Sequence, residues 1–376
     1  MGRRAHGEGT IYQRADGRWC AAVNLGWQDG KRRRKYLYGH TQAEVRNKLR
    51  QTQSDVAAGL PVADDRRSVG DYLNWWLHHH AKDRVRPRTF DSYESRIRLH
   101  LQPTIGHLSL AKLTPAHIQQ LMADKLASGL SARSVQYIHA VLRVALNNAV
   151  RMGIIGRNVA TLTDPPRVTK KEIQPLVPAD ARRFLTTCAN DRLHALYSVA
   201  ISMGLRQAEI LGLRWPNLDL DNANLHVTHQ LQRIGGQWQF TEPKSDRSRR
   251  TLTIPQTCVT ALRAHRATQV TERLAAGPEW DDQDLVFTTH TGRPIDPANQ
   301  LRHFKRICHN IDLGDRRFHD LRHTCATLLL IQGVPLRVVA DILGHSQITL
   351  TADTYQHVIP QLLGDAASAM DSALSG

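Results

Sequence analysis

Residues 204–215 read GLRQAEILGLRW, a pattern that predicts a short helix with one buried side and an arginine at its start. The isoleucine and leucines form the buried side, and Gly204 allows the chain to turn immediately before Arg206. An arginine beside the N-terminal amides of a helix favours a bound anion, because both supply donors and positive charge. A salt bridge between Arg206 and Glu209 explains the same spacing equally well, so this stretch alone leaves both interpretations open.

A second stretch, FHDLRHT at residues 318–324, contains a histidine and an arginine three positions apart. On a helix His319 and Arg322 share a face, while apolar residues form the buried side. A histidine beside an arginine suits proton transfer or charge stabilisation at a phosphate. His319 and His323 are also four apart, as in the zinc motif H-E-x-x-H, but Asp320 stands where that motif has glutamate.

Two further segments follow, LGHS at residues 343–346 and TYQH at residues 354–357. In this order the segments resemble the tyrosine recombinase (phage integrase) family, whose C-terminal domain carries Arg, Lys, His-x-x-Arg, His or Trp, and Tyr. The resemblance covers residues 175–365. The matching positions are Arg206, Lys244, His319, Arg322, His345 and Tyr355. The chain departs from the family in Gln207, where a second basic residue is common, and in its short tail.

The resemblance implies that the enzyme cleaves and rejoins a DNA phosphodiester without metal, ATP or any other cofactor. Tyr355 would attack the phosphorus and form a 3′-phosphotyrosyl bond, while the two arginines bind the non-bridging oxygens. A phenol has an ordinary pKa of about 10, so this nucleophile needs a neighbouring base or a cationic field. By the same resemblance Lys244 protonates the leaving 5′-hydroxyl, and His319 and His345 assist proton transfer.

The overall charge favours a nucleic-acid partner. The 376 residues include 50 Lys and Arg against 34 Asp and Glu, a formal net charge of +16. Residues 1–50 hold 12 basic and 4 acidic side chains, a surplus of 8 that is half of the total. Because each neutralised phosphate releases counterions, this excess indicates a polyanion as partner. A generic basic protein would also carry such a charge, so composition alone leaves both classes open.

The cysteines and the hydropathy pattern indicate the compartment. The five cysteines are scattered and never spaced C-x-x-C, which argues against a disulfide framework or a structural zinc site. No run of 18 apolar residues occurs, and the N-terminus lacks the apolar core of a signal peptide. We therefore expect a cytoplasmic bacterial protein with no membrane partner, associated with the nucleoid when it is bound to DNA.

Residues 9–38 predict a small three-stranded sheet. Apolar side chains alternate with polar or small ones from position 19 to 27, and Asp-Gly pairs on either side signal hairpin turns. A helix follows, opened by the capping box of Thr41 and Glu44. The basic run on this sheet is either a solvated edge or a DNA contact, and neighbouring aromatic residues favour DNA. Its members are Lys31, Arg32, Arg33, Arg34 and Lys35.

The whole chain is therefore expected to be multidomain and mainly α-helical with small β-sheets. Periodic apolar positions predict four helices between residues 68 and 155, a compact bundle. We expect an arm-type DNA-binding domain at 1–60 and a helical, SAM-like core-binding domain at 66–156. A proline-rich linker at 157–178 is expected to be exposed. The mostly helical catalytic domain, with a small antiparallel sheet, would span 179–365, and a tail 366–376.

Taken together, the resemblance and the basic N-terminus indicate an integrase of a phage or other mobile element. The partners it implies are double-stranded DNA with core-type and arm-type attachment sites, and three further protomers in a homotetramer. An excisionase or directionality factor and a host DNA-bending protein are candidate accessory partners. The helical and catalytic domains would close around the duplex as a clamp.

Three alternatives remain open on sequence grounds. A type IB topoisomerase or a chromosome-dimer resolvase uses the same chemistry. A non-catalytic DNA-binding regulator explains the charge but gives the six matched positions no role. A metallohydrolase explains the histidine spacing but gives no role to Arg206, Lys244 or Tyr355, and activity that survives EDTA would exclude it.

Overall fold

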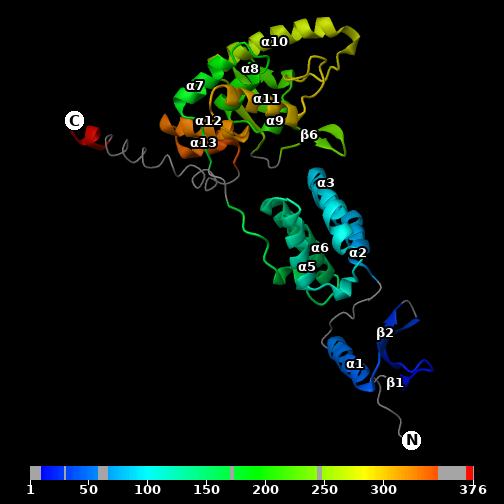
Figure 1. Cartoon of the computed structure of the whole chain (residues 1–376). Helices are drawn as coiled ribbons and strands as arrows, with labels where there is room; N and C mark the ends of the chain where they lie inside the picture. Colours follow the sequence, from blue (N-terminus) through cyan, green and yellow to red (C-terminus); the bar gives the residue numbers. More distant parts are fainter. Residues whose placement is uncertain are drawn as a thin grey trace. The chain divides into compact units, whose positions relative to one another are not determined.

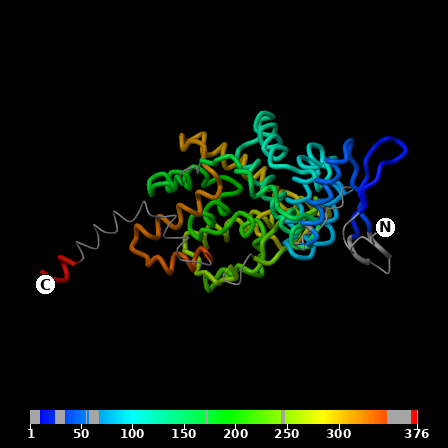
Figure 2. Tube along the Cα trace, turned by 90° about the horizontal axis from the view of Figure 1, so that it is seen from below, coloured from blue at the N-terminus to red at the C-terminus, as the bar shows by residue number. Residues whose placement is uncertain are grey.

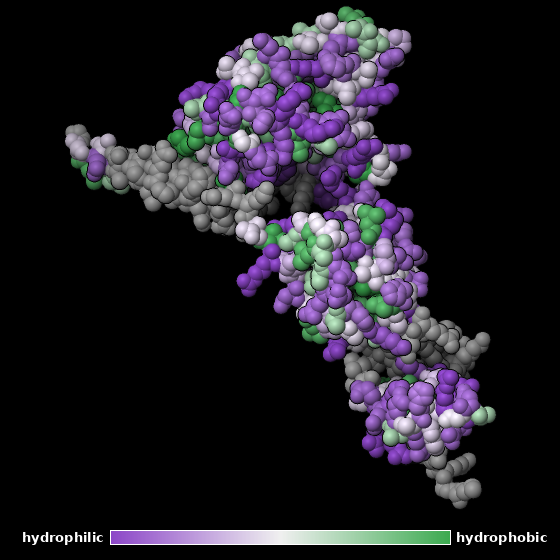
Figure 3. All heavy atoms as spheres, viewed as in Figure 1, coloured by the Kyte–Doolittle hydropathy of each residue, from purple (hydrophilic) through white to green (hydrophobic). Residues whose placement is uncertain are grey.

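The computed structural model describes residues 10–28, 31–57, 67–169, 173–243, 248–345 and 370–375. The chain divides into two compact units, a first unit of Met1–Thr169 and a second unit of Lys170–Gly376. Helices dominate both units and the sheets are small and antiparallel (Figure 1), which confirms the expected fold class. Hydrophilic side chains cover most of the face drawn in Figure 3. Within the described residues, no helix combines the length and apolar character needed to cross a membrane.

The first unit begins with the expected sheet and helix (Figure 2, blue). The strands β1 (Thr10–Gln13), β2 (Trp19–Gln28) and β3 (Lys31–Gly39) pair antiparallel in chain order, and α1 (Gln42–Ala57) follows. Gly17 has a φ of +80°, which suits the tight turn between β1 and β2. Side chains along β2 alternate between the two faces of the sheet, and Ala21 and Val23 on one face pack against Val45 and Leu49 of α1.

The remainder of the first unit is the expected helical bundle. Its elements are α2 (Val69–Trp76), a π-helix η1 (Leu77–Ala81), α3 (Pro87–Arg96), a second π-helix η2 (Ile97–Leu101), α4 (Gln102–Ile105), a 3₁₀-helix η3 (Leu110–Lys112), α5 (Pro115–Ala127), α6 (Ala132–Arg151) and η4 (Val159–Leu162). Ser68 caps α2 by accepting a hydrogen bond from the Asp71 amide. Tyr72, Leu101 and Leu142 come from three different helices and are fully buried in one core.

The segment expected to be an exposed linker is exposed only in part. At its beginning, Val159 and Ala160 are buried, and the ring Nε2 of His139 lies 2.9 Å from the Ala160 carbonyl. At its end, Leu176 is buried and its amide donates to Thr324 Oγ1 at 2.9 Å. The prolines indicated a break in secondary structure, but they do not prevent the flanking apolar residues from packing onto each unit.

The second unit combines helices with two small sheets. Its elements are α7 (Pro178–Thr187), α8 (His194–Met203), α9 (Gln207–Leu211), η5 (Trp215–Asn217), β4 (Leu218–Asp219), β5 (Asn224–Val227), β6 (Gln230–Ile234), β7 (Gln237–Thr241), β8 (Arg250–Thr253), α10 (Gln256–Ala276), η7 (Gly277–Glu279), α11 (Pro297–Asn310), α12 (His319–Ile331) and α13 (Leu336–Leu343). One sheet has the order β4-β5-β8. The other is the hairpin β6-β7, with Gly235 and Gly236 at its turn.

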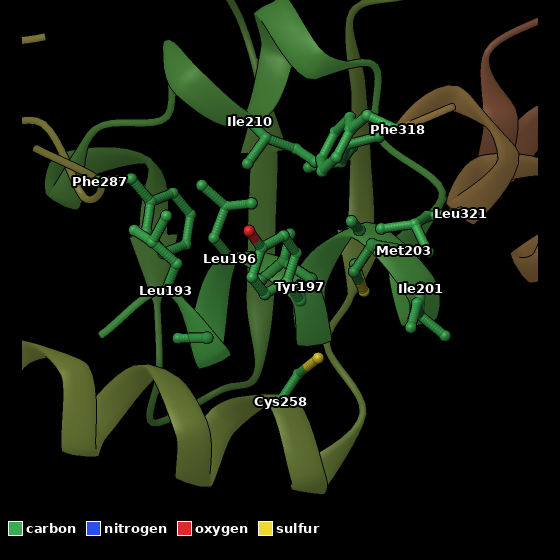
Figure 4. Packing of buried hydrophobic residues seen from close by; sticks show 14 of the residues in the cluster. Leu193, Leu196, Tyr197, Ile201, Met203, Ile210, Cys258, Phe287, Phe318 and Leu321 are labelled. Atoms are coloured by element: carbon green, nitrogen blue, oxygen red, sulfur yellow. The ribbon is translucent and has the colours of Figure 1, made fainter. Parts of the chain in front are cut away.

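One core holds the helices of the second unit in place. Figure 4 shows Tyr197 of α8 in the same buried cluster as Ile210, Phe318 and Leu321. Helix α8 is buried on nearly every side, so other elements pack all around it. Ile210 belongs to α9 and Leu321 to α12, so burial of these side chains fixes the helix that follows Arg206 and the helix that carries His319 and Arg322.

Candidate active site

Arg206 stands at the N-terminus of α9, as its sequence pattern predicts. Gly204 has a φ of +59°, and a Cβ atom there would lie 2.6 Å from Leu343 Cδ2, so only glycine fits this close approach. The Arg206 amide donates to Glu209 Oε2 at 3.0 Å, and its Nη1 donates to Oε1 at 2.6 Å. The salt bridge is therefore present, and it orients a guanidinium that is still 34% exposed.

Glu209 is a buried carboxylate shared by two arginines. Its side chain is 2% exposed, and Oε2 also accepts from Arg250 Nη2 at 3.2 Å. Burial by itself raises the pKa of Glu209, but the charges of Arg250 and Arg206 outweigh it and leave the pKa below its ordinary value. The carboxylate is thus ionised at neutral pH and fixes the direction of Arg206.

Arg322 lies one turn into α12 and is almost completely buried, with 2% of its surface exposed. Its Nη1 donates to the Gly204 carbonyl at 2.7 Å, and its Nη2 donates to the Leu343 carbonyl at 2.7 Å. Arg206 Nη2 donates to the next carbonyl, that of Gly344, at 3.1 Å. The two arginines therefore converge on one short segment, although 116 positions separate them in the chain.

Three histidines surround these arginines. Burial, and after it the charge of Arg322, lowers the pKa of His319 to about 4. Burial, followed by Arg322 and then Arg206, lowers the pKa of His345 to about 4. His323 has its pKa lowered to about 4 by burial and then by His319, whose ring it meets edge to face at 4.8 Å. All three imidazoles are neutral at pH 7, so each ring can donate one proton and accept another.

His345 is positioned by the end of α13. Gly344 ends this helix with a φ of +65°, and the His345 amide donates to the Ala340 carbonyl at 3.0 Å. This cap turns the chain so that His345 comes within electrostatic range of both Arg206 and Arg322. Two guanidinium groups and neutral imidazoles in one place form a site for a phosphate whose negative charge grows during reaction.

The structure brings together four of the six matched positions, Arg206, His319, Arg322 and His345. Lys244, between β7 and β8 in the chain, and Tyr355 both lie outside the described residues. Of the basic run on β3, Arg34 is exposed and Lys35 is half-buried. The side chains of the other three members, Lys31, Arg32 and Arg33, also lie outside the described residues.

Two members of the site were not predicted as such. His323 was noted only for its zinc-like spacing; among the described residues, no group of three His, Cys, Asp or Glu is placed to hold a metal ion. Arg250 is the second, because no sequence pattern assigns it a role. Its contact with Glu209 joins residues 41 positions apart, so no helical or strand spacing signals it.

Comparison with known proteins adds an independent observation. A sequence profile described as the phage integrase family matches residues 166–361, and one for the N-terminal SAM-like domain of phage integrases matches residues 68–126. An integrase of Streptomyces ambofaciens is 31% identical to the chain over 384 residues, covering 98% of this chain and 97% of that relative. The range matched by the phage integrase profile includes the residues of the site described above.

Two solved structures have a similar fold. The Tn1549 transposon integrase in complex with a circular intermediate DNA has a TM-score of 0.66 and 22% identity, covering 77% of this chain and 95% of that one. A lambda integrase tetramer bound to a Holliday junction has a TM-score of 0.57 and 16% identity, covering 90% and 96%. At these identities the likeness concerns the fold.

Proposed function

The chain belongs to the phage integrase family of tyrosine recombinases, and on that premise we propose that Tyr355 cleaves DNA at the site formed around Arg206 and Arg322. Enzymes of this type are site-specific recombinases, and this chain is one of them. The observation that carries the proposal is the convergence of two arginines and two neutral histidines, His319 and His345, from α9, α12 and the end of α13. A regulator that only binds DNA has no use for this arrangement.

In the proposed reaction the Tyr355 oxygen attacks the scissile phosphorus, and the bond from phosphorus to the 5′-oxygen breaks. The phenol proton passes to a neighbouring base, and Lys244 gives a proton to the leaving 5′-oxygen, so that atoms and charges balance. Arg206 and Arg322 bind the non-bridging oxygens, where preorganised donors stabilise the growing charge. Neutral His319 and His345 can assist the proton transfers, since their lowered pKa values leave them unprotonated at pH 7.

The 3′-phosphotyrosyl bond retains the energy of the phosphodiester. A 5′-hydroxyl from a second strand can therefore attack it, release Tyr355 and join the new strand without an external energy source. This reversibility is the reason that cleavage followed by strand exchange recombines DNA, while cleavage followed by water would only break it.

We also propose how the chain assembles on DNA and which part of it binds which site. The lambda integrase of similar fold forms a tetramer on a Holliday junction, and we propose the same stoichiometry on DNA for this chain. Residues 1–60 would bind arm-type sites through β3 and its basic run, and residues 66–156 with 179–365 would hold the core site. Integration and excision of a mobile element, helped by a directionality factor and a DNA-bending protein, is the biological role that this organisation serves.

A nicked attachment-site duplex tests the chemistry. The duplex is taken from the junction between the element carrying the gene and its host DNA, with a nick that lets the cleaved end diffuse away. We expect a covalent complex that resists denaturation and forms equally in EDTA. Tyr355→Phe should bind the same duplex without forming the complex. An adduct that forms equally with Tyr355→Phe would refute the proposal.

Deleting residues 1–60 tests the domain assignment. Loss of the N-terminal sheet should abolish integration between two attachment sites while cleavage of the nicked core duplex continues. Equal integration by the truncated and the full-length protein would show that this module is not an arm-type domain.

A further inference from the structure

Three consecutive backbone carbonyls, those of residues 342–344, each accept a hydrogen bond from a different arginine. The distances are 2.6 Å from Arg250 Nε, 2.7 Å from Arg322 Nη2 and 3.1 Å from Arg206 Nη2. The carbonyls belong to the C-terminal end of α13, which carries partial negative charge. His345 is the next residue, so the three arginines together determine where this histidine lies.

Arg250 differs from Arg206 in its exposure to solvent. Its side chain is 7% exposed, whereas that of Arg206 is 34% exposed. Besides the carbonyl of residue 342, it donates to Glu209 Oε2 at 3.2 Å and to the Ser248 carbonyl at 3.0 Å. Each of its three nitrogens thus holds a fixed protein acceptor, and the guanidinium is directed away from solvent.

We propose that Arg250 is a positioning residue that holds Arg206 and His345 in their reactive places. Its Nη2 donates to the Glu209 carboxylate, whose other oxygen accepts from Arg206 Nη1 at 2.6 Å. Its Nε donates to a carbonyl at the end of α13, three residues before His345. This inference rests on the function proposed above, since it assigns a supporting residue to the same phosphate site.

The planar shape of the guanidinium is essential for this task. Its donors are held in a rigid fork, so one side chain can bind Glu209 and the carbonyl of residue 342 at the same time. A lysine keeps the positive charge that neutralises Glu209, but its single ammonium cannot span both acceptors in this geometry. Arg250→Lys therefore separates the charge of Arg250 from its bridging geometry.

The chain offers a matched control. Arg192 is also largely buried, at 21% exposure, and also bridges a glutamate and a backbone carbonyl. Its Nε and Nη2 donate to Glu272, and its Nη1 donates to the Thr288 carbonyl at 2.6 Å. Arg192→Lys makes the same chemical change in the same unit. The partners of Arg192 are Glu272 and Thr288, so this change leaves the contacts of Glu209 and α13 intact.

The experiment compares cleavage of two nicked attachment-site duplexes by the full-length wild type and both variants. One duplex carries the natural scissile phosphate. The other carries a methylphosphonate, which lacks the negative charge that Arg206 and Arg322 neutralise. Misplacement of a positioned group by about 1 Å costs roughly 100-fold in rate, so we expect a loss of that order for Arg250→Lys on the phosphate. On the neutral methylphosphonate the loss should be several-fold smaller.

Several other outcomes would contradict the proposed role of Arg250 or the proposed function. Equal losses on the two duplexes, no loss, or a loss shared by Arg192→Lys would overturn the positioning role. An Arg250→Lys protein that no longer folds, judged by circular dichroism, would also overturn it, because the residue would then serve the fold alone. Absence of any adduct with wild type on the phosphate duplex would instead contradict the proposed function.

Discussion

Replacing Glu209 with glutamine should destabilise the second unit strongly. The carboxylate accepts from the Arg206 amide, from Arg206 Nη1 and from Arg250 Nη2. Glutamine has the same shape but only one acceptor oxygen, and its amide group would face a donor at the other position. The change also leaves Arg250, at 7% exposure, without its counter-charge.

The size of the effect follows from burial. Breaking a buried ion pair by removing one partner costs about 3–5 kcal/mol, and Glu209 at 2% exposure belongs to this class. For a domain of this size each kcal/mol lowers the melting temperature by about 2–4 °C, so the expected decrease is roughly 6–20 °C. Asp341→Asn is the control, because Asp341 and Arg337 form an exposed pair worth at most about 0.5 kcal/mol.

Thermal unfolding followed by circular dichroism measures both variants at pH 7 against the wild type. Glu209→Gln should melt well below the wild type, and Asp341→Asn should melt within about 2 °C of it. If Glu209→Gln melts with the control, the carboxylate does not hold the two arginines in the way described.

Two further predictions concern pH and packing. The pKa of His319 is about 4 in the folded chain and about 6.5 when unfolded, so the unfolded chain binds more protons between these values. Stability should fall as pH falls from 6.5 to 4, and His319→Gln should make this decrease shallower in urea titrations; parallel curves would contradict the shift. Leu142 of α6 is fully buried, so Leu142→Ala should cost about 2–5 kcal/mol in urea unfolding. Val144→Ala, on the exposed face of the same helix, should change stability by less than about 0.5 kcal/mol, and equal costs would refute the packing.

Local patterns were enough to predict the sheet and the four helices of the first unit. Alternating side chains and Asp-Gly turns indicated β1 to β3, and the capping box of Thr41 and Glu44 indicated where α1 begins. The π-helical turns η1 and η2 were not predicted, because five residues are too few for the apolar pattern to reveal a change of period. The partly buried linker was not predicted either, since packing onto each unit depends on tertiary neighbours.

In the candidate site, too, some residues were predicted from the sequence and others were not. The sequence order of family-like motifs predicted that Arg206, Arg322 and His345 would meet, and the structure brings them to one helix end. Arg250 was not predicted because its two main partners, Glu209 and residue 342, lie 41 and 92 positions away. A buried arginine that supports other arginines has no short-range signature, so only the folded chain reveals it.

Identification of the protein residue joined to DNA tests the central claim most directly. The covalent complex formed on the nicked duplex can be digested with protease and nuclease, and its nucleotide-bearing peptide sequenced by mass spectrometry. We predict a single phosphotyrosyl link at Tyr355, carried by the 3′ end of the DNA. A link at another residue, or cleaved DNA that carries no peptide, would contradict the mechanism.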